Sequence, residues 1–193
     1  MTCLQQSASS LVDGIVEGFL KIKTAIVEPF EEPQPGLNAF LITHGLIPQN
    51  GEGGAFGYGL LTAGGDSIIV TPTHAGVLDS ETQGAIKDNP IWHNHFVQLT
   101  TGKSGLCPAE EIDTITFEQP GSVEISGRIA SLLGIPGTFS GTNALTNTPI
   151  TLSPGNDVEQ AVLFTLEPHF DSSGALLAVC VNDITPAENL IVR

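Results

Sequence analysis

Two histidines stand one residue apart in the segment NPIWHNHFVQL, residues 89–99, and they are the clearest candidates for chemistry in the chain. Alternate residues of a β-strand share one face, so a strand here places His93 and His95 on the same side as Val97 and Leu99. Because valine and leucine continue that side, we expect it to face the protein interior. Buried imidazoles need polar partners, and one divalent metal ion would satisfy both rings. The alternative is that both histidines hydrogen-bond to neighbouring side chains or face solvent.

A metal site needs further ligands, and the segment just before this strand offers them. THAGVLDSETQ, residues 73–83, contains His74 and Glu81. Because this segment is close in sequence to the His-x-His strand, little loop-closure entropy is lost when the two come together. A later segment, LEPHFD, contains His169. The preferred set of metal ligands is His74, His93 and His95, with Glu81 or His169 as the fourth. For His74 and His169 the alternative is an ordinary position in a loop or at a strand end.

The paired histidines resemble the first motif of the cupin barrels, in which His-x-His is followed by a glutamate and a second motif carries another histidine. The chain departs from that pattern in two places. The glutamates after His95 are Glu110 and Glu111, which are too distant, and the segment GIPGTFSGTN contains no histidine. Because the resemblance covers only about ten residues, we do not assign the chain to the cupin family.

Two classes of function follow from the histidines. In the first, the chain is a metal-dependent enzyme that acts on a small molecule, with zinc, iron or manganese as Lewis acid or water activator and Glu81 as the candidate general base. In the second, it is a non-catalytic β-sandwich module that binds a ligand or partner, or an assembly module, and the histidines are structural. The metal content of the purified protein distinguishes the two classes.

The elements that would position these residues are short strands. From Leu37 onward, apolar or alternating runs are separated by Gly, Pro, Asn and Asp, and Thr, Val, Ile and Phe are frequent. We expect strands near 38–46, 55–63, 67–72, 91–100, 112–118, 121–127, 137–141, 160–168 and 174–184. Their regular spacing predicts a mostly β domain, residues 37–186, built as an antiparallel barrel or sandwich. The segment SGRIASLLGIPG could contain a short helical turn.

The two ends of the chain differ in composition from this domain. Residues 1–36 comprise an amphipathic helix over 7–28, with apolar residues at spacings of three and four, and a linker rich in Pro and Glu over 28–36. The apolar stripe of the helix could pack on the domain itself or on a second copy, which would make a homo-oligomer. Residues 187–193 form a C-terminal tail of uncertain order.

The charge balance excludes two kinds of partner. The chain has 21 acidic and 6 basic residues, for a formal net charge of −15. Such a surface repels phosphate backbones and anionic headgroups, so we expect neither nucleic acid nor membrane-surface binding. A small-molecule ligand is compatible with this charge.

The cysteines bear on the compartment. Cys3, Cys107 and Cys180 are odd in number and form no CxxC motif. Free thiols in a reducing, cytoplasmic setting fit best, with Cys180 as a small apolar core residue, and one Cys107–Cys180 disulfide is the alternative.

Overall fold

The computed structural model describes residues 35–48, 55–74, 91–187 and 189–192, which belong to the second of two units of the chain, residues 33–193. These ranges contain twelve strands, and no helix within them has the length and apolar character to cross a bilayer. The strands are β1 (Leu37–Ile42), β2 (Phe56–Thr62), β3 (Ile68–Thr73), β4 (His95–Thr101), β5 (Glu110–Ile115), β6 (Ser122–Ser126), β7 (Ile129–Ile135), β8 (Phe139–Thr142), β9 (Pro149–Leu152), β10 (Val158–Phe170), β11 (Leu176–Pro186) and β12 (Asn189–Val192). The predicted helix over 7–28 and Glu81 lie outside the described residues.

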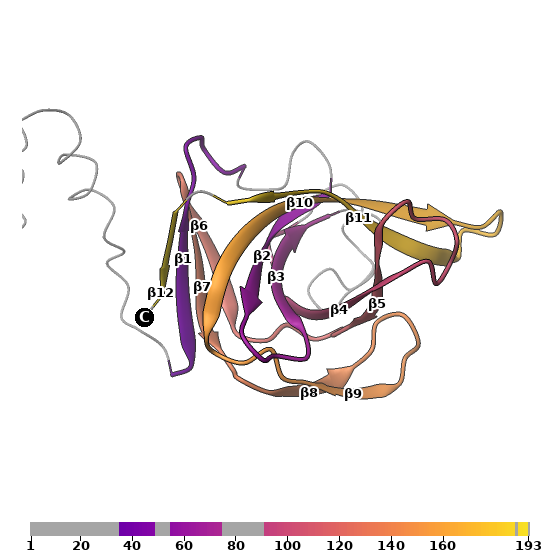
Figure 1. Cartoon of the computed structure of the whole chain (residues 1–193), viewed down its shortest axis with the longest axis horizontal. Helices are drawn as coiled ribbons and strands as arrows, with labels where there is room; N and C mark the ends of the chain where they lie inside the picture. The colour runs from indigo at the N-terminus through magenta and orange to yellow at the C-terminus, as the bar shows by residue number, and fades with distance from the viewer. Residues whose placement is uncertain (1–34, 49–54, 75–90, 188, 193) are drawn as a thin grey trace, which may run out of the picture. The chain divides into compact units, whose positions relative to one another are not determined.

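Six of the strands close into an antiparallel barrel in the order β10-β11-β5-β4-β3-β2 (Figure 1). The pairing of β10 with β2 completes the ring, with Phe164 opposite Gly57 and Val162 opposite Gly59. The prediction of a mostly β, antiparallel domain is therefore confirmed. The sequence left a barrel and a sandwich open, and these six strands form a barrel.

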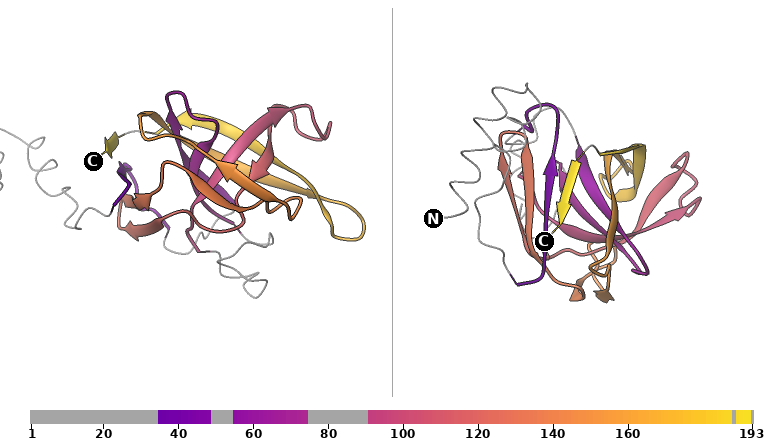
Figure 2. Two further views of the ribbon diagram at one scale, coloured as in Figure 1. Left: turned by 90° about the horizontal axis from the view of Figure 1, so that it is seen from below. Right: turned by 60° about the vertical axis from the view of Figure 1, so that its left-hand side comes forward.

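A four-stranded sheet, β12-β1-β7-β6, lies beside the barrel, as the two views of Figure 2 show. Its strands pair antiparallel, and β1 lies between β12 and β7. Apolar residues of this sheet, such as Leu41 and Leu132, share one core with Leu60, Ile69 and Phe96 of the barrel. The outer faces of β2, β3 and β4 are thus covered by the sheet.

The inner faces of the barrel strands form a second, smaller core. Val70, Val97, Ile112 and Phe164 belong to it, and each comes from a different strand. Because side chains alternate along a strand, each of β2, β3 and β4 supplies one set of residues to the core under the sheet and the other set to the barrel interior.

The segment that could have held a helical turn is a strand instead. β7 lies between β1 and β6 and follows β6 through a tight turn, in which Gly127 has a positive φ of 60°. Ala130 to Leu133 are all buried, so this segment lacks the alternation that marks half-exposed strands. The prediction of a short helical turn in this segment is therefore wrong. Two further strands, β9 and β12, were not predicted.

A disulfide joins Cys107, in the loop between β4 and β5, to Cys180 of β11. The expectation of free thiols is therefore wrong for these two residues, and the disulfide that the sequence left open is present. Cys180 is fully buried, as predicted. The cysteine argument for the cytoplasm assumed free thiols, whereas disulfides are typical of oxidising compartments.

Candidate metal site

Three histidines meet where β3 ends and β4 begins. These strands are antiparallel, with Val70 opposite His95, so the residues after β3 lie beside those before β4. The His93 N–H donates a hydrogen bond of 3.2 Å to the carbonyl of Pro72, which extends this pairing beyond the strands. His74, two residues after Pro72, is thereby placed against His93.

The side chains before and along β4 alternate as the sequence predicted. Val97 belongs to the barrel-interior core, and the rings of His93 and His95 contact each other with centroids 4.7 Å apart. Trp92 and Phe96 belong instead to the core under the four-stranded sheet. The Trp92 indole N–H donates to the carbonyl of Pro48 at 2.7 Å. The two histidines therefore share a buried face.

The geometry of the three rings suits a single ion. His74, His93 and His95 are 7%, 0% and 2% exposed, and each offers one ring nitrogen within 4.8 Å of the other two. The Nε2 atoms of His74 and His93 are 3.0 Å apart. Two nitrogens bound to one tetrahedral zinc at about 2.0–2.1 Å would lie about 3.3 Å apart, so a small adjustment would accommodate the ion.

A backbone contact decides which nitrogen of His93 faces the cluster as an acceptor. The Nδ1 atom of His93 is 2.9 Å from the carbonyl oxygen of Ile91. A carbonyl only accepts hydrogen bonds, so Nδ1 carries the proton and, in the neutral ring, the lone pair is on Nε2. Metal-binding histidines commonly donate their other N–H in this way, because the contact orients the ring.

His95 is held in its neutral form. Burial lowers its pKa well below the ordinary value of 6.5, and the neighbouring His93 and His74 lower it further, whereas a backbone hydrogen bond with Thr116 acts in the opposite direction. Its Nδ1 atom is buried and makes no hydrogen bond in the part of the chain that the structure describes. Neutral imidazole is the form that binds metals, so this ring is ready to coordinate without losing a proton.

The other predicted site residues lie elsewhere. His169 is on β10 opposite Ala178, and its Nε2 is 3.8 Å from a carboxylate oxygen of Glu167. It is not part of the three-histidine cluster. Glu81 lies in the segment 75–90, outside the described residues.

No family model, curated protein or solved structure matches the chain. Its function is therefore argued from its own geometry.

The sequence reasoning missed one feature of the barrel, an apolar cavity of about 290 Å³ in its interior. A signal for it exists in FGYGLL, residues 56–61, where Gly57 and Gly59 alternate with larger residues. Glycines at alternate positions of a strand leave one face bare, and that face of β2 is turned toward the barrel interior.

Proposed function

We propose that this chain is a metal-binding β-barrel protein in which His74, His93 and His95 hold one divalent ion. The observation that carries the proposal is the convergence of three buried ring nitrogens from two paired strands. Burial of three imidazoles within one cluster is costly unless their polar atoms are satisfied, and a shared ion satisfies all three.

Three histidine ligands leave a coordination position open. Zinc sites of catalytic type have three protein ligands and keep the fourth position for water or substrate, whereas structural sites are closed by four protein ligands. An ion here would polarise a substrate oxygen or lower the pKa of bound water, which supports the hypothesis of a metal-dependent enzyme for a small molecule. Glu81, seven residues after His74, remains the candidate general base.

The donor atoms favour some metals over others. Imidazole suits zinc, iron, copper and nickel, while manganese prefers carboxylate and water oxygens. Among the three metals considered from the sequence, an all-histidine set favours zinc or iron over manganese.

One observation favours the alternative, a non-catalytic binding module with structural histidines. The 3.0 Å contact between His74 and His93 is also a good hydrogen bond, so these two rings can satisfy each other without an ion. Metal affinity separates the two functions.

The test is zinc binding by the purified full chain, measured by calorimetry and by elemental analysis after dialysis. We expect about one equivalent in the wild type and in the His169→Ala control, since His169 lies outside the cluster. His74→Ala and the double variant His93→Ala/His95→Ala are expected to lose it. His74 lies just after β3 ends, outside the strand pairing, so we expect its variant to fold even if the double variant does not.

A metal-free wild type whose unfolding midpoint is the same with zinc and with chelator would overturn the metal proposal and leave the structural alternative. A bound ion must raise that midpoint, because it binds the folded state selectively.

A further inference from the structure

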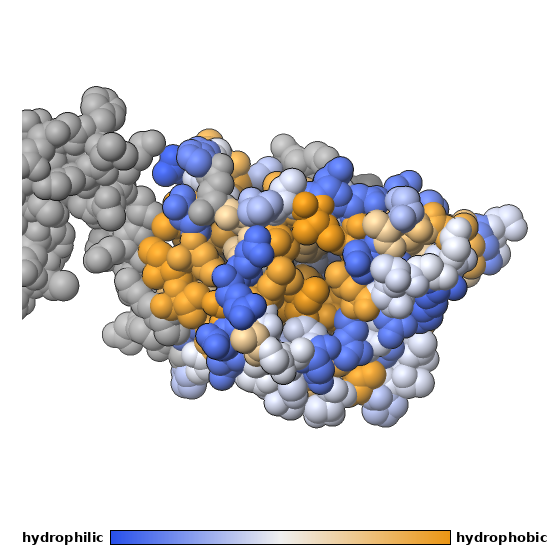
Figure 3. Space-filling view, in the orientation of Figure 1, coloured by the Kyte–Doolittle hydropathy of each residue, from blue (hydrophilic) through white to orange (hydrophobic). Residues whose placement is uncertain are grey.

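The barrel interior contains an apolar cavity of about 290 Å³ that all six barrel strands line. Every residue that lines it has a non-polar side chain except Glu110, the first residue of β5. Figure 3 shows hydrophobic residues gathered at the centre of the face where Figure 1 looks into the barrel, with hydrophilic residues around them.

β2 contributes Gly59 and Leu61 to the lining of the cavity. Gly59 lines the cavity, and a Cβ atom added there would lie 3.1 Å from a methyl group of Val162. Protein interiors are close-packed and rarely leave voids larger than a water molecule, because lost contacts and lost burial are destabilising. A cavity of this size is therefore better explained by an occupant than by a defect in packing.

The lining defines what the occupant is. An engineered cavity of about 150 Å³ accepts benzene, so this cavity, about twice as large, accepts two fused rings or an alkyl chain of about ten carbons. The lining offers no hydrogen-bond donor side chain, and its one polar group is the carboxylate of Glu110. Together with a net charge of −15, that carboxylate disfavours an anionic ligand.

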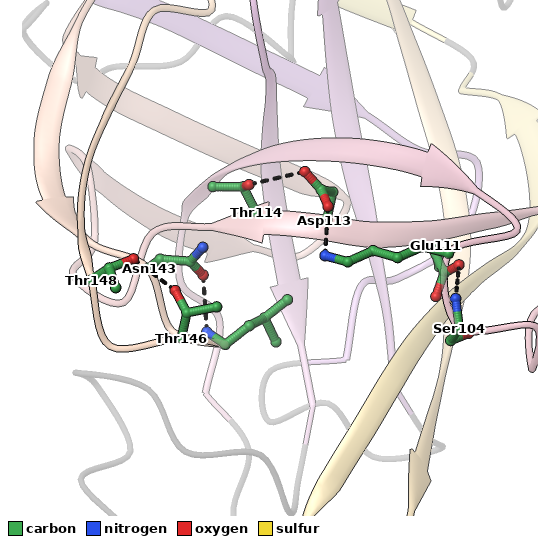
Figure 4. A network of polar contacts seen from close by, with 9 residues as sticks. Ser104, Glu111, Asp113, Thr114, Asn143, Thr146 and Thr148 are labelled. Atoms are coloured by element: carbon green, nitrogen blue, oxygen red, sulfur yellow. Dashed lines mark hydrogen bonds and ion pairs between the residues drawn. The ribbon is translucent and has the colours of Figure 1, made fainter.

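The rim next to Glu110 is preorganised. The loop between β4 and β5 is tied to β11 by the Cys107–Cys180 disulfide. Two further contacts hold this loop. The Ser104 N–H donates a hydrogen bond of 2.8 Å to the carboxylate of Glu111 (Figure 4). Lys103 forms an ion pair with Asp113 at 2.6 Å. A rim that is already ordered lowers the entropic cost of binding.

We propose that the barrel cavity binds a small apolar molecule, uncharged or cationic, with about ten to twelve carbon atoms. The site is distinct from the histidine cluster but adjoins it. His95 is the cross-strand neighbour of Val70 and shares a strand face with Val97, and both of these residues line the cavity. Binding of the apolar molecule does not require the metal ion, because the histidines do not line the cavity.

The test is titration of the full chain with N-phenyl-1-naphthylamine, a neutral dye that fluoresces in apolar surroundings, followed by competition. We expect saturable binding of one dye per chain, displaced by 1-decanol and by decylamine, with decanoate at least about tenfold weaker. The same result is expected with a chelator present, so failure here is distinguishable from failure of the metal proposal.

Two matched variants locate the dye. Leu99→Trp fills the cavity from β4 and is expected to weaken dye binding by at least about tenfold. Leu163→Trp adds the same side chain on the outer face of β10, where Leu163 is 36% exposed, and is expected to leave binding unchanged. If Leu99→Trp fails to fold, Glu110→Lys replaces it, and this variant is expected to bind decanoate better than decylamine.

Absence of saturable dye binding by the wild type would overturn the proposal, as would equal binding by the wild type and a folded Leu99→Trp variant. Equal displacement by decanoate and 1-decanol would overturn its charge selectivity.

Discussion

At the scale of single residues, His95 and Glu111 are buried side chains whose surroundings favour opposite charge states, neutral for the histidine and charged for the glutamate. Burial lowers the pKa of His95, so the ring stays neutral and able to bind a metal ion. The side-chain and backbone hydrogen bonds with Ser104 lower the pKa of Glu111, so its carboxylate stays charged although the residue is only 2% exposed. Each residue is thereby held in the protonation state that its neighbours can satisfy.

We predict that Glu111 contributes to stability only above acidic pH. Its pKa in the folded protein lies below the ordinary value of 4.5, so its contribution is fully present above 4.5 and is lost as the pH falls through the folded value. Glu111→Gln should therefore destabilise the protein near pH 6, and its difference from wild type should shrink by about pH 3. Urea unfolding followed by the fluorescence of Trp92, the single tryptophan, measures this difference.

The exposed Glu124 on β6 gives the matched control, since Glu124→Gln should leave stability nearly unchanged at both pH values. A difference between Glu111→Gln and wild type that is constant with pH would contradict the prediction.

At the scale of elements, the barrel is held at two places where strands or loops meet closely. One is the covalent link between the β4–β5 loop and β11. The other is the contact of β2 with β3, where a Cβ on Gly57 would lie 2.7 Å from the backbone of Pro72 and Thr71. Each feature can be removed separately.

We predict that loss of the disulfide lowers the free energy of unfolding. The bond closes a long loop, because its cysteines are 73 residues apart in sequence. Cys107→Ala/Cys180→Ala should cost about 2–4 kcal/mol in guanidinium unfolding. Cys3→Ser, which leaves this bond intact, is the control and should match wild type. If the double variant is as stable as wild type under non-reducing conditions, the link does not stabilise the fold.

We predict a difference between the two glycines of β2. Gly57→Ala places a methyl group against backbone atoms, which cannot move without shifting β3, and should cost about 1–3 kcal/mol. A Cβ on Gly59 meets side-chain atoms and no backbone, the nearest being a methyl group of Val162, so Gly59→Ala should cost less than about 1 kcal/mol. Thermal unfolding of both variants measures their stabilities. Equal losses of stability would show that the close approach of β2 to β3 does not determine the cost of a substitution on β2.

At the scale of the whole molecule, charge opposes the compact state. A net charge of −15 on 193 residues implies self-repulsion, which salt screens over a Debye length of about 8–10 Å at moderate ionic strength. Surface ion pairs such as Lys103–Asp113 offset little of it, because both side chains are substantially exposed.

We predict that the unfolding midpoint rises as sodium chloride increases from about 0.01 M to about 0.5 M, because screening relieves repulsion among carboxylates. Potassium chloride should give the same rise, which separates screening from binding of a particular cation. A midpoint that is flat or falls over this range would contradict the prediction.

The sequence by itself determined what depends on short-range alternation. His93 and His95 share a buried face, and Phe96 points the other way, because successive side chains of any strand point to opposite faces. The mostly β class followed from the same periodicity and from the frequency of turn residues. These features can be predicted without knowing which strands are neighbours in the sheet.

Only the tertiary structure decided what depends on strand pairing. The register of β3 with β4 brought His74 to the pair, while β10 holds His169 elsewhere. Ring closure by β10 and β2 created the cavity, and the pairing of β5 with β11 placed Cys107 close enough to bond with Cys180. The physical reason is that pairing joins segments far apart in sequence, and local periodicity contains no information about the partner of a strand.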